Sequence, residues 1–541
     1  MLRQYQLTNF KAFGDTDPLP IRPITLIYGP NSSGKSSILQ SLLLLKQTLE
    51  EAESTDVRLL PKGKLTNLGN YREFVHRHDV NQPFGIKVVF KVGDSPNLGL
   101  RITFAYDQQK NIPIFSAVDL FQDREDIPIV TYREETAGNN VVLTVDTVHS
   151  EHPFWQNWWK NGQPKLLDLF RHQTNDAIKA WQQLKSITAN QKKKISDALA
   201  KQIAPLKQEL EQIEPDQRSQ SPLADCIDEM EYLIDLDQRL KTYTLAQAIE
   251  DFLKVTSYSF MGYRNFLPDN PGEWQKEFFS FEEFFPLEII HLFKLHQRLG
   301  TFEALSNLTI EAANLLRVFL GEIIYIAPLR DYPERLYIFS GNTSEQVGKT
   351  GKGISDLLFK RPDLLERVNQ RLKDFDLKYE LKVEKFTSQD TAQLSDIFAL
   401  RLVDQFTDVN VSMLDVGFGI SQVLPIIIQS MASSGKIIMI EQPEIHIHPR
   451  LQTELGSLLA ECIKEPFYND FIIETHSEHL MLRLQKLIRK GELDVEDVSV
   501  IYVDRTADGA KCKLLRLDEE GYFIDEWPNG FFEEGYKERF S

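Results

Sequence analysis

Short apolar runs separated by polar turns dominate residues 1–150 of the chain. Val, Ile and aromatic residues concentrate in these runs, and such residues favour strands bounded by turn residues. The runs that we expect to form strands are Gln6–Phe13, Ile24–Tyr28, Phe84–Val92, Leu98–Ala105, Ile127–Tyr132 and Asn140–Val148. The pattern predicts a β-rich lobe in this part of the chain.

The pattern becomes helical and charged from Pro164 to Val255. Apolar residues recur there at three- and four-residue steps, the spacing of one helix face: Ile195, Leu199, Ile203, Leu206, Leu210 and Ile213. Pro205 should kink or end this helix, and residues 214–222 read as the turn into a second one. The pair is either a short antiparallel arm or an ordinary helical subdomain packed on the core.

Strand and helix patterns alternate in the second half of the chain. After a helical stretch, Phe278–Gly321, the apolar runs are Glu322–Ile326, Ser395–Val403, Lys436–Ile440 and Phe471–Ile473. Such alternation favours an α/β fold. We therefore expect an α/β head split between residues 1–160 and 321–490, a helical insertion at 161–320 and a C-terminal tail region at 491–541.

The most specific motif is a complete phosphate-binding loop that follows the apolar run Ile24–Tyr28. Its glycines let the backbone approach a triphosphate, and the next helix, Lys35 to about Glu50, points its N-terminus at the phosphates. We expect Lys35 to reach the β- and γ-phosphates and the Ser36 hydroxyl to meet Mg²⁺. The nucleotide-binding residues are Gly29, Pro30, Asn31, Ser32, Ser33, Gly34, Lys35, Ser36 and Ser37.

Two later strands end in residues that complete such a site. The run Lys436–Ile440 leads into Glu441, Gln442 and Glu444, and a carboxylate at a strand end can orient Mg²⁺ beside the phosphate-loop serine. The run Phe471–Ile473 leads into His476, which its order after the acidic strand predicts to be a γ-phosphate sensor.

A glycine-serine segment precedes both of these strands. Glycines and a serine at a helix start can bind a phosphate through exposed N–H groups. A second subunit is one source of such a segment. The segment contains Gly417, Gly419, Ser421 and Gln422. His446 and His448 lie two residues apart, but with no cysteine or third histidine nearby we favour a structural or dimer-loop role over metal binding.

Composition limits the classes of protein that fit. At 541 residues the chain exceeds the size at which one core keeps growing, so at least two structural units are expected. A net charge of -18 argues against a protein that coats nucleic acid with its whole surface. Cys226, Cys462 and Cys512 are far apart, which indicates a reducing compartment. The polar N-terminus and the lack of an apolar run of roughly 20 residues predict a cytoplasmic protein with no membrane partner.

The order of the motifs resembles that of ABC-type ATPases of the chromosome-maintenance and recombination-repair class. More closely, it resembles bacterial ATPases related to the overcoming-lysogenization-defect proteins. Four segments carry this resemblance: Leu7–Phe13, Glu441–Pro449, Glu474–Ser477 and Glu526–Phe532. The last is similar to the tail of a subfamily whose C-terminal domain has no known function.

The resemblance implies an α/β P-loop NTPase of ABC type that uses ATP and Mg²⁺, with Ser36 and Glu441 as metal ligands. It also implies a homodimer or higher homo-oligomer in which ATP lies between the phosphate loop of one head and the signature of the other. The usual signature is Leu-Ser-Gly-Gly-Gln, from which Gly417–Gln422 departs. Gln442 occupies the place of the usual catalytic glutamate, and since glutamine cannot accept a proton, we expect slow hydrolysis or the use of Glu444.

Three functions follow from these observations. The first is a nucleotide-gated dimeric switch that controls a protein effector, such as a nuclease encoded nearby, in anti-phage defence, the context that the resemblance implies. The second is a DNA-binding ATPase of recombination or repair, with a lysine strip as the contact: Lys185, Lys192, Lys193, Lys194, Lys201 and Lys207. The third, an intrinsic nuclease, is disfavoured because Asp504 and Asp508 make no convincing acidic metal cluster.

Overall fold

The computed structural model describes most of the two ends of the chain. The described residues are 1–160 except 55, 56, 125, 138, 139 and 159; 203–204, 207–208, 263–264 and 267–268; and 301–532 except 342–344 and 387–395. The predicted helical segment Pro164–Val255 with its lysine strip therefore lies outside the described residues, apart from 203–204 and 207–208, which are helical. By their contacts, residues divide into two compact units: Met1–Ser116, Arg264–Leu267 and Ala312–Ser541 form the first, and Ala117–Tyr263 with Pro268–Glu311 form the second.

The first unit is built around a parallel sheet. Its neighbouring strands are, in order, β12 (Ile323–Ile326), β17 (Ile437–Glu441), β18 (Asp470–Glu474), β4 (Ile24–Tyr28) and β19 (Val498–Thr506). Each adjacent pair is parallel. Strands of this kind are covered on both faces, which explains their continuous apolar runs. Because all run the same way, their carboxyl ends meet at one edge of the sheet.

Further strands continue the sheet of the first unit beyond β19. They are β20 (Gly509–Leu514), β2 (Phe13–Asp15), β1 (Leu2–Phe10), β5 (Phe84–Phe90) and β6 (Leu98–Asp107), with β3 (Leu19–Pro20) paired to β1. Their pairs are antiparallel, except that β2 pairs parallel with β20. The β-rich lobe is thus confirmed, but the single strand expected over Gln6–Phe13 was wrong. Phe10 pairs with Phe13, so the chain reverses at residues 11 and 12, and Lys11 has a φ of 48°. No glycine or proline marks this turn, which is why the apolar pattern missed it.

The second unit contains β8 (Val130–Ala137) and β9 (Asn140–Val148), with β7 (Ile112–Gln122) entering from the first. These strands pair antiparallel in chain order. The fully buried Trp155 donates its indole N–H to the Ile129 carbonyl at 2.9 Å. β7 was not among the expected strands, and the expected run Ile127–Tyr132 becomes strand only from Val130. β10 (Tyr263–Arg264) and β11 (Leu267–Pro268) form a separate pair.

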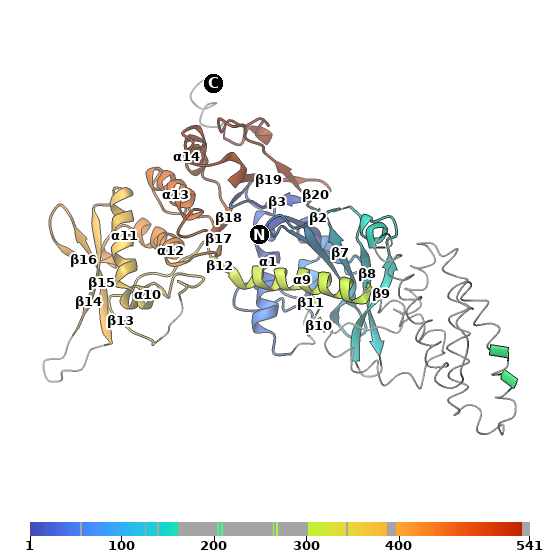
Figure 1. Ribbon diagram of the computed structural model, residues 1–541. Coiled ribbons are helices and arrows are strands. Elements are labelled where there is room, and N and C mark those ends of the chain that lie inside the picture. Colours follow the sequence, from blue (N-terminus) through green and yellow to red (C-terminus); the bar gives the residue numbers. More distant parts are fainter. Residues whose placement is uncertain are drawn as a thin grey trace, which may run out of the picture. The chain divides into compact units, whose positions relative to one another are not determined.

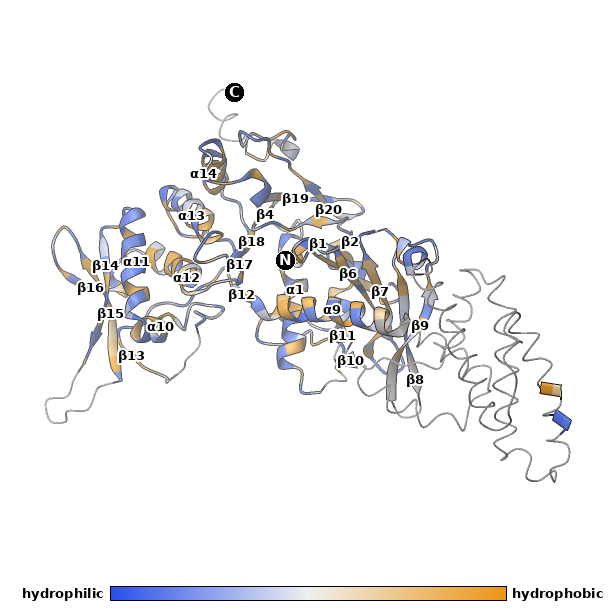
Figure 2. Ribbon diagram, in the orientation of Figure 1, coloured by the Kyte–Doolittle hydropathy of each residue, from blue (hydrophilic) through white to orange (hydrophobic). Residues whose placement is uncertain are grey.

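The first unit also contains helices, some on the parallel core and others beside a small second sheet. They are α1 (Lys35–Glu51), α10 (Ile354–Lys360), α11 (Pro362–Asp374), α12 (Phe418–Ala432), α13 (Pro449–Cys462) and α14 (Glu478–Arg489), while α9 (Thr301–Glu322) leads into β12 (Figure 1). Short turns of helix are α2 (Tyr71–Phe74), η1 (His76–His78), η4 (Met413–Asp415), η5 (Val495–Asp497) and η6 (Pro528–Gly530). α12 is largely hydrophobic and α11 largely hydrophilic (Figure 2). This contrast fits a buried helix beside an amphipathic one.

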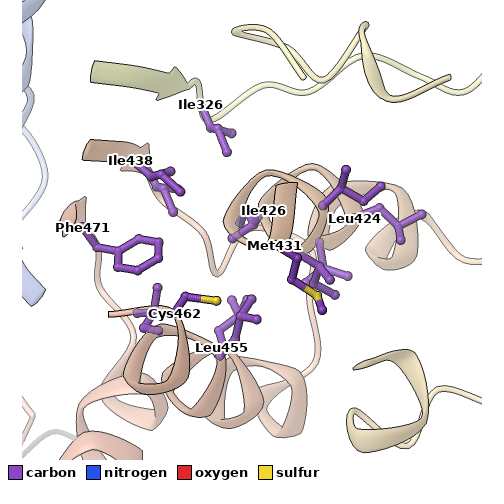
Figure 3. Close-up of a cluster of buried hydrophobic side chains, with 14 of the residues drawn as sticks. Ile326, Leu424, Ile426, Met431, Ile438, Leu455, Cys462 and Phe471 are labelled. Atoms are coloured by element: carbon purple, nitrogen blue, oxygen red, sulfur yellow. The ribbon is translucent and has the colours of Figure 1, made fainter. Parts of the chain in front are cut away.

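The core forms where α12 and α13 pack on the strands. Ile326, Ile438 and Phe471 point from β12, β17 and β18 toward these helices (Figure 3). Ile426 and Met431 of α12, with Leu455 and Cys462 of α13, meet them from the other side (Figure 3). Burial of this face holds the strand ends in a fixed register, which the site at the sheet edge requires.

A small antiparallel sheet lies between β12 and α12 in sequence. Its order is β13 (Tyr337–Ile338), β15 (Ile397–Asp404) and β14 (Tyr379–Lys385), with β16 (Asn410–Ser412) also paired to β15. β15 confirms the strand expected over Ser395–Val403. Across the described part of the chain, no helix combines the length and the apolar character needed to cross a membrane.

Candidate nucleotide site

The phosphate loop joins β4 to α1 and takes a conformation that requires its glycines. Gly29 has a φ of 144°, and a Cβ there would lie 2.2 Å from the Val503 carbonyl oxygen. Gly34 has a φ of 113°, and a Cβ there would come within 2.9 Å of the Ala12 side chain. Both positions favour glycine because other residues rarely adopt these angles and because neighbouring chain segments pack closely on the loop. Pro30, Asn31 and Ser32 are exposed at its tip, and Ser33 and Ser37 are buried.

Lys35 is buried at the start of α1, with a relative exposure of 3%. Its Nζ donates to the carbonyl oxygens of Gly29 at 3.0 Å and Pro30 at 2.9 Å. Burial lowers the pKa of this lysine, and the nearby carboxylates of Glu474 and Glu444 oppose that shift. The Lys35 ammonium group is thus placed to exchange its hydrogen bonds with the loop carbonyls for hydrogen bonds with a phosphate.

The carboxyl ends of β17 and β18 bring two glutamates to the same level of the sheet. Glu441 and Glu474 are register partners across these strands. Glu474 is the closer to the phosphate loop: the Ser36 side chain lies near enough to lower the pKa of its carboxyl group, and its Oε1 lies 4.0 Å from the Lys35 Nζ. Glu441 instead accepts a hydrogen bond from the Tyr325 hydroxyl at 2.8 Å.

Burial perturbs both carboxyl groups. It raises the pKa of Glu441 to about 7; the Glu474 charge adds to this rise, and the Tyr325 hydrogen bond opposes it. Burial likewise raises the pKa of Glu474, against the effect of Ser36 and Lys35. Burial disfavours the negative charge of both carboxyl groups, so a cation bound between them would stabilise their ionised forms.

Glu444 holds the turn that carries His476. One of its oxygens accepts from the Thr475 hydroxyl and the other from the His476 backbone N–H, both at 2.7 Å. Burial lowers the pKa of His476 to about 4, and the Lys35 charge acts in the same direction. The imidazole is therefore neutral at pH 7, and it can offer one hydrogen bond to a phosphate without a full charge.

Gln442 and Arg330 flank Glu441. Gln442 adopts a φ of 46° and donates its backbone N–H to the Glu474 carbonyl oxygen at 2.7 Å. Arg330 is 4% exposed and donates its Nη2 to the Glu441 carbonyl oxygen at 3.1 Å. Burial lowers the pKa of this arginine to about 10. The two residues hold the end of β17 in place from opposite sides of the peptide chain.

Several buried polar atoms of this region have no hydrogen-bond partner among the described residues. They are the Ser33 hydroxyl, Glu474 Oε2, His476 Nε2, and Nε and Nη1 of Arg330. An unsatisfied buried polar group costs about 1 to 3 kcal/mol, and proteins keep few of them. Their concentration around the phosphate loop and the strand ends fits a polar ligand. Hydroxyl and carboxylate oxygens also fit Mg²⁺, and the donors fit the phosphates of ATP.

The signature residues lie at the start of α12. Gly417 caps this helix, and a Cβ on Gly419 would come within 2.8 Å of the His446 carbonyl oxygen. Ser421 and Gln422 are buried, and Gln422 Nε2 has no hydrogen-bond partner in the part of the chain that is described. The described contact of Gly419 is thus with the turn after β17 and not with the phosphate loop.

His448 caps α13, because its Nδ1 accepts from the Arg450 backbone N–H at 3.2 Å. His446 is exposed and has a φ of 61°. Among the residues that the structure describes, no group of three or more His, Cys, Asp or Glu side chains is placed to hold a metal ion. The capping bond gives His448 the structural role favoured by the sequence.

The C-terminal segment adds an aromatic cluster beside the site, formed by Trp527, Phe531 and Phe532. All three rings contact Tyr28, the residue before Gly29, at centroid distances of 5.3, 6.3 and 5.6 Å. Phe531 also stacks on the His476 ring at 6.2 Å. The Tyr28 hydroxyl donates to the Ser477 carbonyl oxygen at 2.9 Å, which ties the end of β4 to the start of α14.

Sequence reasoning missed two residues of this site. Glu474 was recognised only as part of a motif, and Arg330, four residues beyond β12, was not singled out. The available signal was position: each follows or ends an apolar strand, and the carboxyl ends of parallel strands meet at one edge. What was lacking was the order of those strands in the sheet.

These features define a class of protein. A parallel sheet with the order β12-β17-β18-β4-β19, a phosphate loop after β4, and acidic and histidine residues after β17 and β18 make an α/β P-loop ATPase head of ABC type with a β-rich N-terminal lobe. The chain belongs to the family described as "AAA ATPase domain", which matches residues 1–261 and 328–481. Residues 493–539 match "Protein of unknown function (DUF3696)", which confirms the resemblance of the tail.

Other similarities are shorter or weaker. A segment of 43 residues is 51% identical to the "Chromosome partition protein Smc" of a Synechococcus strain and spans 8% of this chain but 4% of that protein. The Smc head domain of Pyrococcus furiosus, solved with the C-terminal domain of ScpA, is 12% identical with a TM-score of 0.34, covering 95% of this chain and 96% of that one. The SMC head domain of Thermotoga maritima is 9% identical with a TM-score of 0.34, covering 95% and 99%. Scores this low do not establish a common fold, which rests here on the strand order and the family match.

Proposed function

We propose that this protein binds and slowly hydrolyses ATP with Mg²⁺ and acts as a nucleotide-gated dimeric switch. One observation carries the proposal: Lys35, Ser36, Glu474 and His476 meet at one edge of the parallel sheet, where several buried polar atoms have no partner among the described residues. Bound Mg²⁺ would supply positive charge between the phosphates. The backbone N–H groups of the loop and Lys35 would bind the phosphates, and Ser36 with an acidic strand end would hold the metal.

The remaining site residues would position water and sense the γ-phosphate. Gln442 can orient a water molecule but cannot remove its proton, which supports slow turnover. Glu444 accepts two hydrogen bonds from the turn after β18, and these contacts support a role for Glu444 in positioning His476. The neutral His476 would donate one hydrogen bond to the terminal phosphate.

Dimerisation would complete the site. One head offers few groups for the outer side of the γ-phosphate, and the start of α12, with Gly417, Gly419, Ser421 and Gln422, carries N–H groups suited to that contact. We propose that these residues come from a second copy of the chain. The aromatic cluster would then transmit closure of the dimer to the C-terminal segment, because Phe531 contacts His476 and Trp527 contacts Tyr28.

We further propose that the switch controls a protein effector, such as a nuclease encoded nearby, in anti-phage defence, on the basis of the motif resemblance. Light scattering with a nonhydrolysable ATP analogue tests the switch, and phage plating on cells carrying the gene and its neighbours tests the context. Lys35→Ala should lose both responses, whereas the exposed Lys62→Ala should keep both. An analogue that leaves mass and hydrodynamic radius unchanged would contradict nucleotide-driven closure. Equal plating with wild type and Lys35→Ala would contradict the defence role.

A further inference from the structure

The carboxylate that lies nearest to the phosphate-loop serine is at the end of β18, not β17. The strand order β17-β18-β4 places Glu474 on the direct neighbour of the loop strand and Glu441 one strand further away. Neighbouring strands are separated by about 4.8 Å. Glu474 is also the register partner of Ile27, two residues before Gly29. The sheet therefore brings Glu474, rather than Glu441, to the base of the loop.

The contacts of the two glutamates differ accordingly. Glu474 Oε1 lies 4.0 Å from the Nζ of Lys35, the residue directly before Ser36, whose hydroxyl is suited to Mg²⁺. Its second oxygen, Oε2, is buried without a hydrogen-bond partner among the described residues, and the residue is 4% exposed. Glu441 already accepts from Tyr325, on the opposite neighbour of β17.

We propose that Glu474 provides the carboxylate that, with Ser36, holds Mg²⁺ in this protein, an inference that rests on the ATP-binding function proposed above. Mg²⁺ is commonly held by one or two carboxylates together with substrate phosphates. Glu474 offers such an oxygen beside the serine, and Lys35, now its neighbour at 4.0 Å, is free to turn to the phosphates once a cation balances the carboxylate. Glu441 then acts from β17, which is one strand farther from the phosphate loop than β18.

The test is the gain in nucleotide affinity that Mg²⁺ brings. The full-length protein is titrated calorimetrically with a nonhydrolysable ATP analogue, once with EDTA and once with MgCl₂. In the wild type, Mg²⁺ should strengthen binding. Glu474→Gln should reduce that gain by about tenfold or more, the lower end of the effect of altering a metal site, while the EDTA affinity should not fall, because the substitution removes a negative charge beside Lys35. Glu441→Gln should keep the larger part of the gain.

Controls separate the metal from the fold. Asp470→Asn changes an acidic residue at the other end of β18 and should keep both the gain and the EDTA affinity. Glu474→Asp retains the charge but withdraws it by one methylene, so it should show an intermediate gain. As a second readout, Mn²⁺ with the analogue should give a bound electron paramagnetic resonance signal that Glu474→Gln loses.

The outcomes are distinct. A full Mg²⁺ gain in folded Glu474→Gln would overturn the inference, and its loss in Glu441→Gln alone would assign the metal to Glu441. If the wild type binds no analogue in either buffer, the proposed function itself fails. If Glu474→Gln keeps its affinity in EDTA but loses the gain from Mg²⁺, the result supports both the metal assignment and the proposed ATP-binding function.

Discussion

The Nζ of Lys35 lies 4.0 Å from Oε1 of Glu474, and both side chains are almost fully buried. The lysine comes from the start of α1 and the glutamate from the end of β18, so the pair joins segments far apart in sequence. Without nucleotide, each partly balances the charge of the other. Phosphate would compete for the lysine, and a cation for the glutamate, so under the proposed function this pair would couple nucleotide binding to metal binding.

Lys35→Ala should abolish detectable ATP binding, a loss of more than about tenfold, because the lysine provides the charge that meets the phosphates. The protein should remain folded, since burying the lysine charge is itself unfavourable and its removal offsets the lost bonds to Gly29 and Pro30. Calorimetry and thermal unfolding measure the two effects. Unchanged ATP affinity in a folded Lys35→Ala protein would refute the assignment of the site.

Gln442→Glu should increase steady-state phosphate release by about tenfold or more, because it supplies a proton acceptor where only a water-orienting amide stands. Its backbone N–H bond to Glu474 is kept, so little change in stability is expected. Glu444→Gln serves as the comparison. The glutamine keeps only one acceptor oxygen. It would therefore turn its NH₂ group toward the His476 backbone N–H or lose the hydrogen bond from Thr475. The turn should loosen and the rate of ATP hydrolysis should fall. Brisk wild-type hydrolysis that survives Gln442→Ala but collapses in Glu444→Gln would instead make Glu444 the working base.

Glu441→Gln should stabilise the nucleotide-free protein at pH 8 and leave it unchanged at acid pH. Burial raises the pKa of Glu441 in the folded protein to about 7 from its ordinary value of 4.5, so the folded protein holds this proton more tightly than the unfolded chain. The contribution of this group is fully present below pH 4.5 and is lost as the pH rises through 7. The neutral amide avoids that loss, which is worth up to about 3 kcal/mol.

Urea unfolding at several pH values between 4.5 and 8 measures this difference. The exposed Glu366→Gln is the matched control and should shift the free energy of unfolding equally at each pH. A Glu441→Gln protein that is less stable than wild type at pH 8 would show that Glu441 is ionised and stabilising in the free protein.

Trp527→Ala should lower the free energy of unfolding by about 2 kcal/mol, because a half-buried tryptophan loses ring contacts and apolar burial. Its partners include Tyr28 and Phe532, at 5.3 and 4.5 Å. ATP affinity should also fall, since Tyr28 directly precedes Gly29. Tyr522→Ala, at a 52% exposed position of the same C-terminal region, should change neither quantity. Equal effects of the two substitutions would show that the cluster has no special link to the site.

The sequence by itself determined the local parts of this protein. The phosphate loop was recognisable because its glycines, lysine and serine act through backbone conformations set within a few residues. The strand β4 and the helix α1 were predicted nearly to the residue, because a continuous apolar run and a helix N-terminus are local signals. The strands before Glu441 and His476 were found in the same way.

Only the tertiary structure decided which of these residues meet. The register of β17, β18 and β4 makes Glu474 the neighbour of Ser36, and no local pattern encodes the order of strands in a sheet. In the same way, β19 lies beside β4 although it comes from residues expected to form a tail. Strand order is set by which apolar faces bury one another across hundreds of residues, so the partners of a strand-end side chain become known only once the core has formed.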